Sequence, residues 1–203
     1  MHKIKADNTA IIFIGYQNDY FSPQGVLNSA LAETLQSNQC LAHSIDLIEQ
    51  VKNTATLLIA TPIMFSHDYS EIKHAIGILH SIKEQEAFCE GSFGVESIPE
   101  FKTYEQRLIT LTGKRGLNAF SNTQLAEHLK AHAIENVVIA GLLTPLCVDS
   151  TGRDAYDLGY RVYIIEDCTS ADNDFNQNYY INTVFPFYAQ TITRSALAAQ
   201  LNH

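Results

Sequence analysis

The chain has 203 residues, 46% of them hydrophobic, and carries a formal net charge of -9. This length suits one α/β domain over residues 1–203, and the negative charge excludes a general affinity for nucleic-acid phosphates. No apolar run is long enough to span a bilayer or to form a signal-peptide core, so we expect a cytoplasmic protein without membrane contacts.

Short apolar runs typical of β-strands alternate with helical patterns along the chain. The expected strands are residues 10–14, 56–61, 108–111, 137–140, 162–165 and 190–193. The helical patterns cover residues 29–51, a segment that begins at Ser121, residues 144–159 and residues 173–185. This alternation predicts a doubly wound α/β fold, with a six-stranded, mostly parallel sheet of order 3-2-1-4-5-6 and helices on both faces.

The predicted strand order directs attention to three segments. Strands 1 and 4 adjoin at the topological switch point, and ligands bind beyond the carboxyl ends of such strands. Residues 15–19, 113–115 and 141–147 therefore hold the first candidates for a site. The long, weakly patterned segment 84–106 is a hypothetical lid or rim over that crevice.

Cys147 is the strongest candidate residue. It falls in the first turn of the helix after strand 4, where Thr144 would be the N-cap and Pro145 the first helical residue. The unpaired N–H groups and the helix dipole favour an anion there, so a reactive thiolate and a stabilised oxyanion are both plausible. The alternative is a thiol that merely packs, which we expect for the remaining cysteines, Cys40, Cys89 and Cys168.

Lys114 follows strand 3 and lies between Gly113 and Gly116. A cation at this edge of the sheet would favour a thiolate or hold a substrate carbonyl or carboxylate, although a solvated loop lysine is the alternative. Tyr20 and Phe65 also follow strands, and they could stack on a planar substrate or pack under the rim.

Three segments in the same order resemble the isochorismatase-like cysteine hydrolases: residues 10–20 (AIIFIGYQNDY), residues 113–125 and residues 136–160. The resemblance implies a Cys-Lys-Asp triad in which Cys147 is the nucleophile and Lys114 the lysine. It also implies a cis peptide at Leu142–Leu143, an oxyanion hole from the N–H groups of Leu143 and Cys147, and a homodimer or homotetramer. We expect a small-molecule substrate to contact Gly15, Gln17, Tyr20 and Phe65.

One position departs from the family pattern. The family's catalytic aspartate would fall at Gly15, and glycine can neither accept a proton nor orient a lysine. The candidate replacements are Asp19, Glu84 and Glu86, or else the substrate or a water molecule takes the proton. Two other hypotheses stay open: a catalytically impaired binding or regulatory protein, and a thiol redox sensor.

Metal-ligand patterns are missing from the sequence. Nicotinamidases of the same superfamily carry an Asp-x-His motif after strand 2, and residues 61–68 lack it. His67, His74 and His80 do not share one helix face, so we expect surface histidines, no metal ion and no cofactor. The sequence thus predicts a metal-independent cysteine hydrolase that cleaves a small amide, imide or related bond through a covalent Cys147 intermediate.

Overall fold

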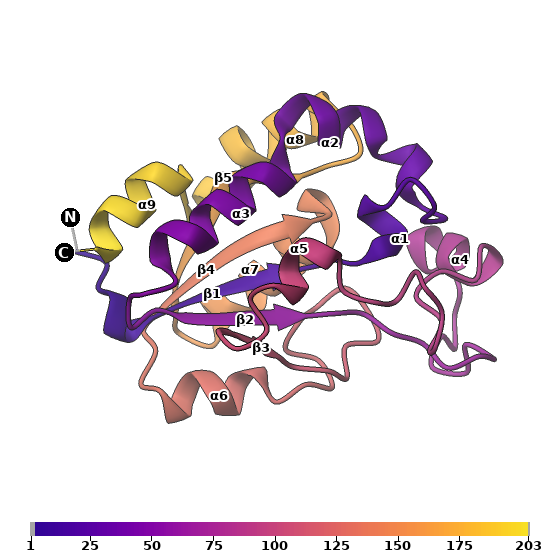
Figure 1. Ribbon diagram of the computed structural model, residues 1–203, viewed down its shortest axis with the longest axis horizontal. Helices are drawn as coiled ribbons and strands as arrows, with labels where there is room; N and C mark the ends of the chain where they lie inside the picture. The colour runs from indigo at the N-terminus through magenta and orange to yellow at the C-terminus, as the bar shows by residue number, and fades with distance from the viewer. Residues whose placement is uncertain (1–2, 203) are drawn as a thin grey trace.

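A six-stranded parallel sheet organises the computed structural model, which describes residues 3–202 (Figure 1). The strand order is β3-β2-β1-β4-β5-β6 and every neighbouring pair is parallel, which confirms the predicted doubly wound architecture. The strands are β1 (Thr9–Ile14), β2 (Leu57–Thr61), β3 (Leu108–Thr110), β4 (Asn136–Leu142), β5 (Arg161–Ser170) and β6 (Gln190–Ile192).

The strands occupy the predicted segments, with one clear extension. β5 continues to Ser170, five residues beyond the expected end, and its register against β4 shifts between Ile139 and Gly141. The apolar run stops at the half-buried pair Glu166 and Asp167, but strand pairing resumes after the irregularity. Side-chain patterning alone therefore ended this strand too early.

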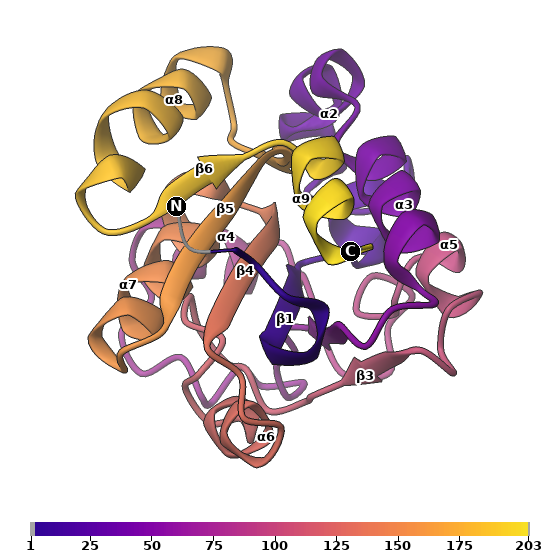
Figure 2. The same cartoon turned by 90° about the vertical axis from the view of Figure 1, so that its left-hand side faces the viewer.

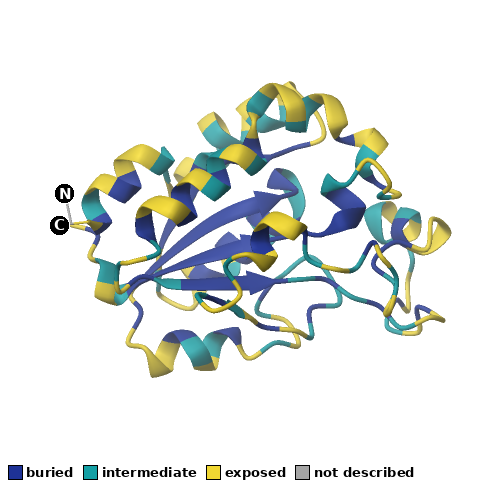
Figure 3. Ribbon diagram, viewed as in Figure 1, coloured by how far each residue is buried: buried dark blue, intermediate teal, exposed yellow. Residues whose placement is uncertain are grey.

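Helices cover both faces of the sheet (Figure 2). One face packs under α3 (Cys40–Val51), α5 (Pro99–Lys102) and α9 (Arg194–Leu201), and the other under α6 (Leu125–Ala131) and α7 (Asp149–Asp157). All six residues of β1 are buried, as Figure 3 shows for the central strands. Burial on both faces explains why β1 is a continuous apolar run rather than an alternating one.

Two helix predictions need correction. The pattern over residues 29–51 is broken into a short 3-10 turn, α2 (Ala32–Asn38) and α3, because Gln39 has φ of +53° and the Asn38 side chain accepts a hydrogen bond from Cys40 N. The helix expected from Ser121 begins at Leu125 instead, where Thr123 Oγ1 accepts from Leu125 N. None of the helices described is both long enough and apolar enough to cross a membrane.

The segment 84–106 lies against the turn between β1 and α1 (Asn18–Phe21). Asn18 N donates to Glu96 O at 3.0 Å, and Asp19 N donates to Gly94 O at 2.9 Å. Near the far end of the segment, Ile98 N donates to Tyr16 O at 3.2 Å. The segment is therefore fastened at the carboxyl edge of the sheet, toward which the strand arrows point in Figure 1.

Candidate active site

The loop that carries Cys147 follows β4 directly. The Leu142–Leu143 peptide is cis, as expected, and a π-helical turn, Thr144–Val148, then continues into α7. The N-cap residue is Leu143, so the expected Thr144 cap is wrong. The Thr144 hydroxyl instead donates to Gln177 Oε1 at 2.7 Å. Cys147 lies within this first turn and is 6% exposed.

Lys114 is brought to Cys147 by the neighbouring loop. Its side chain is 1% exposed, and Nζ lies 3.5 Å from Cys147 Sγ. Nζ also donates to Gly116 O at 2.5 Å. Gly113 has φ of +112°, and a Cβ there would meet Asn122 O at 2.1 Å, so the bend that aims Lys114 requires glycine.

The Lys114 ammonium has no carboxylate partner. None of the seven ion pairs within residues 3–202 includes it. Its hydrogen-bond partners in that range are the Gly116 carbonyl oxygen and the Cys147 sulfur. A buried cation needs a compensating charge, and the ionisable hydrogen-bond partner of Lys114 among residues 3–202 is Cys147.

Tyr20 occupies the space beside Gly15. Gly15 has φ of +77°, and a Cβ at this position would lie 3.2 Å from both Leu142 O and the Tyr20 ring. The ring is buried and packs against Phe88, with 4.9 Å between ring centroids. Burial raises the pKa of Tyr20 well above its ordinary value, and the nearby Cys147 thiol and Asp19 carboxylate raise it further.

The three carboxylates proposed as replacements do not reach Lys114. Asp19 Oδ2 accepts a hydrogen bond from Phe88 N at 2.6 Å, and Oδ1 accepts one from Val26 N at 3.3 Å. Asp19 thus fastens the loops around the site. Glu84 and Glu86 are exposed, away from the buried Lys114 side chain, so the expectation that one of these three groups completes a triad is not met.

Gln17 and Phe65 support the loops. The Gln17 amide donates to Ile63 O at 2.8 Å and to Val95 O at 2.7 Å, and its oxygen accepts from Ile63 N at 2.9 Å. Phe65 is fully buried and stacks on Tyr69. Neither side chain offers a substrate an unused polar group or an exposed ring here, which differs from the expected substrate contacts.

Thr61, at the carboxyl end of β2, was missed by the sequence reasoning. It pairs in register with Ile14 and lies on the same side of β2 as Ile59. Ile59 belongs to the hydrophobic cluster that includes Cys147. Its hydroxyl is one of two fully buried side-chain polar atoms without a hydrogen bond in the described chain. The signal that could have found it is a threonine at the end of a strand next to the switch point.

The three histidines that follow β2 are on the surface, as predicted. His67, His74 and His80 are exposed, and His67 Nδ1 lies 3.3 Å from Cys89 Sγ. Within residues 3–202 no three His, Cys, Asp or Glu side chains are grouped to hold a metal ion.

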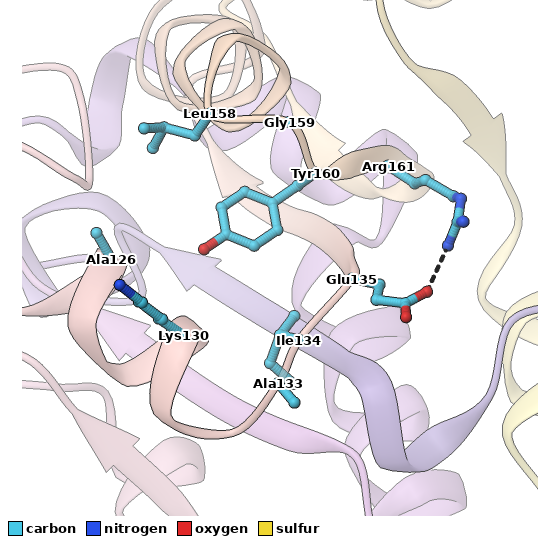
Figure 4. A pocket seen from close by; sticks show the side chains of 9 residues that line it. All are labelled: Ala126, Lys130, Ala133, Ile134, Glu135, Leu158, Gly159, Tyr160 and Arg161. Atoms are coloured by element: carbon cyan, nitrogen blue, oxygen red, sulfur yellow. Dashed lines mark hydrogen bonds and ion pairs between the residues drawn. The ribbon is translucent and has the colours of Figure 1, made fainter.

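A separate cavity of about 640 Å³ lies at the amino edge of the sheet (Figure 4). It is lined by the ends of α6 and α7 and by the starts of β4 and β5, and the Arg161–Glu135 ion pair borders it. No cysteine, serine or threonine lines it, and it is at the opposite end of the strands from Cys147.

Comparison with known proteins decides the family. The sequence profile described as "Isochorismatase domain" matches residues 9–196. The chain belongs to the isochorismatase family. Isochorismatase relatives include a ureidoacrylate amidohydrolase, RutB, of Azorhizobium caulinodans, 23% identical over 94% of this chain and 88% of the relative.

Solved isochorismatase-type structures share the fold. A cysteine hydrolase from Pseudomonas syringae pv. phaseolicola superimposes with a TM-score of 0.80 at 19% identity, covering 100% of this chain and 96% of the other. N-carbamoylsarcosine amidase from Thermoplasma acidophilum gives a TM-score of 0.71 at 22% identity, over 92% and 96% of the two chains. At these identities the likeness concerns the fold alone.

Proposed function

We propose that the chain is a cysteine hydrolase that cleaves a small-molecule amide, imide or related bond through a covalent intermediate on Cys147, with no metal ion or other cofactor. The observation that carries this proposal is the buried Lys114–Cys147 pair, with 3.5 Å between Nζ and Sγ. A cation this close to a thiol at a helix start favours the nucleophilic form of sulfur. The family to which the chain belongs consists of hydrolases, which agrees with this chemistry.

The proposed reaction begins when the Cys147 thiolate attacks the substrate carbonyl carbon and forms a C–S bond. The carbonyl oxygen takes the negative charge, and we assign its stabilisation to the N–H groups of Leu143 and Cys147. The C–N or C–O bond then breaks and leaves a thioester. Water hydrolyses the thioester, which releases the acid and returns the thiolate.

Small substrates fit the enclosure of this site. Cys147 and Leu143 are only 6% and 7% exposed. Cys147 belongs to a cluster of buried hydrophobic residues, and the Lys114 ammonium is the charged group beside its thiol. A compact carbonyl compound that places its scissile bond between Cys147 and Lys114 matches this arrangement.

The decisive test compares Cys147→Ala with Cys89→Ala, a matched change at a thiol outside the site. Both variants and the wild type are assayed against a panel of small amides and imides and mixed with 4-nitrophenyl acetate for intact mass spectrometry. We expect wild type and Cys89→Ala to form one acetyl adduct on Cys147 and Cys147→Ala to form none. An unlabelled Cys147 in the wild type, with no hydrolysis of the panel, would contradict the proposal.

A catalytically impaired binding or regulatory protein is the second candidate, and one observation favours it. Lys114 lacks a carboxylate partner among the described residues, and Gly15 stands where we place the family's aspartate. Such a protein would bind a small ligand, or acylate once, without turnover. Multiple turnovers per molecule in the same assay exclude this candidate.

The proposed lack of a metal requirement has a direct test. Activity of the wild type after dialysis against EDTA should equal activity before dialysis, and added Zn²⁺ or Mn²⁺ should not raise it. A loss on dialysis that a metal ion restores would overturn this part of the proposal.

We also propose a homodimer or homotetramer. Phe175 and Phe187 are 77% and 81% exposed, and Phe175 stacks on the half-exposed Tyr179. Large exposed aromatic side chains are typical of protein interfaces. Sedimentation of wild type and Phe187→Asp tests the assembly, because the charged variant should sediment as a smaller species.

A further inference from the structure

Acyl transfer from an amide needs more than a thiolate and a cation. The leaving nitrogen must receive a proton, and the water that attacks the thioester must lose one. Lys114 already donates to Gly116 O and to Cys147 Sγ, and no carboxylate of the described residues pairs with it. The site therefore needs another group that holds a proton near Cys147.

Tyr20 is the titratable side chain whose position fits this need. Its ring lies directly over the end of β1, within 3.2 Å of a Cβ at Gly15, and Phe88 packs on the ring. The hydrophobic cluster that holds Tyr20 and Phe88 also includes Leu143 and the partly buried Leu146, which belong to the turn that holds Cys147. A buried ring held by two neighbours keeps its hydroxyl in a fixed place, as a proton donor requires.

The Tyr20 hydroxyl is also unused. Within residues 3–202 it has no hydrogen-bond partner, whereas the hydroxyl of Tyr69, in the same hydrophobic cluster, donates to Ala87 O at 2.9 Å. The fully buried side-chain polar atoms without a partner are Thr61 Oγ1 and Asn136 Oδ1, so some of the Tyr20 oxygen surface stays accessible. An unpaired phenol facing accessible space is available to a substrate atom.

We propose that Tyr20 is the proton-transfer residue of this site: its phenol protonates the leaving group, and the resulting phenolate deprotonates the hydrolytic water. This inference rests on the proposed function. The Lys114 ammonium lies 3.5 Å from the Cys147 sulfur, and the Tyr20 ring shares a hydrophobic cluster with Leu143 and Leu146 of the turn that holds Cys147. The Asp19 carboxylate is occupied by Phe88 N and Val26 N.

The steps balance. As the Cys147–carbon bond forms and the carbon–nitrogen bond breaks, the Tyr20 proton moves to the nitrogen, and an amine leaves. The negative charge passes from sulfur to the phenolate, so the positive charge of Lys114 stays compensated. The phenolate then takes a proton from water, hydroxide adds to the thioester carbon, and the carbon–sulfur bond breaks to restore the thiolate and the neutral phenol.

The raised pKa of Tyr20 agrees with both roles. At neutral pH the phenol keeps its proton, which is what a donor to a departing amine requires. Once formed, the phenolate is a strong base toward water. A tyrosine with a lowered pKa would be ionised before the substrate arrived and would repel the thiolate.

The test uses Tyr20→Phe, with Tyr69→Phe as the matched control in the same cluster. Two acetyl substrates are compared: 4-nitrophenyl acetate, whose leaving group departs without a proton, and 4-nitroacetanilide, whose amine must leave protonated. With 4-nitrophenyl acetate we expect the burst and the turnover of Tyr20→Phe to stay within threefold of wild type, because Tyr20 never gives up its proton. With 4-nitroacetanilide the release of 4-nitroaniline by Tyr20→Phe should fall by about 10²-fold or more.

The outcomes separate the two proposals. Equal release of 4-nitroaniline by Tyr20→Phe and wild type overturns the role of Tyr20 and leaves the cysteine hydrolase intact. Loss of the burst from 4-nitrophenyl acetate in Tyr20→Phe also overturns it, because the hydroxyl would then act on the thiol or on folding. Absence of acetyl-Cys147 in the wild type after mixing with 4-nitrophenyl acetate overturns the proposed function itself. Tyr69→Phe should keep the rates with both substrates within threefold of wild type.

Discussion

Two thiol environments lie on opposite faces of the sheet, and they differ in charge rather than in burial. On the α3 face, Cys40 and Cys168 are fully buried, and burial is the main reason that the pKa of Cys40 rises to about 12 and that of Cys168 rises as well. On the α7 face, Cys147 is nearly as enclosed, but Lys114 lies 3.5 Å away. Burial alone keeps a thiol protonated, and an adjacent unpaired cation opposes that effect.

The cations themselves show the same contrast. Arg194, near Cys168, pairs with Asp46 at 2.8 Å and with Asp167 at 2.5 Å, so its charge is already compensated. Lys114 pairs with no carboxylate within the described residues. Compensation by a carboxylate therefore distinguishes Arg194 from Lys114.

The largest expected effect is in alkylation of the native protein. At pH 7 iodoacetamide should label Cys147 at least about 10³-fold faster than Cys40 or Cys168, because the latter two react only when the α3 face opens. Peptide mass spectrometry over a time course measures all three rates. In denaturant the three alkylation rates should converge. Similar alkylation rates of the three cysteines in the native protein would contradict the expected difference between the two faces.

Removing the Lys114 cation should slow the alkylation of Cys147 toward the rates of Cys40 and Cys168. In Lys114→Met the alkylation rate of Cys147 at pH 7 should fall by about 10- to 100-fold, since an opposite charge at this distance is typically worth about 1–2 pK units. Arg194→Met is the matched control, and it should leave the rate of Cys147 unchanged. A rate in Lys114→Met that equals wild type would show that the cation does not activate the thiol.

Adding a carboxylate on the Cys147 side is expected to cost stability. Gly15→Asp should lower the free energy of unfolding by about 1–2 kcal/mol, because φ of +77° is unfavourable for residues with a Cβ and that Cβ would crowd the Tyr20 ring. Gly15→Ala separates this backbone cost from the charge. Urea unfolding of the three proteins measures it, and an Asp variant as stable as wild type would contradict the reasoning.

The smallest effect compares two buried hydroxyls. Thr61→Val removes a hydroxyl without a partner, so stability should stay within about 0.5 kcal/mol of wild type or rise. Ser44→Ala removes a hydroxyl bonded to Tyr16 at 2.6 Å and to Cys40 O at 2.7 Å, and should cost about 1–2 kcal/mol. Thermal unfolding distinguishes these outcomes, and equal losses would show that Thr61 has an unrecognised structural role.

Much of the fold was predictable because the central strands β1, β2 and β4 are buried almost throughout, so that they form continuous apolar runs. The edge strands β3 and β6 are more exposed and have weaker patterns, and the strand-to-helix crossovers constrained the order. The same logic placed Lys114 and Cys147 together, although 33 residues separate them, because both follow strands at one edge of the sheet.

The parts that could not be predicted depend on contacts between loops. Gln17 was expected to meet substrate, but its amide is used by Ile63 and Val95, from two segments whose paths no local pattern reveals. Thr144 was expected to cap a helix, but its hydroxyl donates a hydrogen bond to Gln177, which lies 33 residues further along the chain. Asp19 was a candidate catalytic group, and its carboxylate is held by Phe88 N. Polar side chains have several acceptable partners, and tertiary packing selects among them.

The near-complete enclosure of Cys147 also limits the size of the molecules that can reach its sulfur. With 6% of the residue exposed, we expect Cys147 to react slowly with bulky disulfides and with electrophiles attached to macromolecules, and faster with compact carbonyl compounds and hydrogen peroxide. Selectivity of this kind would follow from access to the sulfur rather than from its intrinsic reactivity. A nucleophile screened in this way can stay strongly reactive without being consumed by the many larger electrophiles around it.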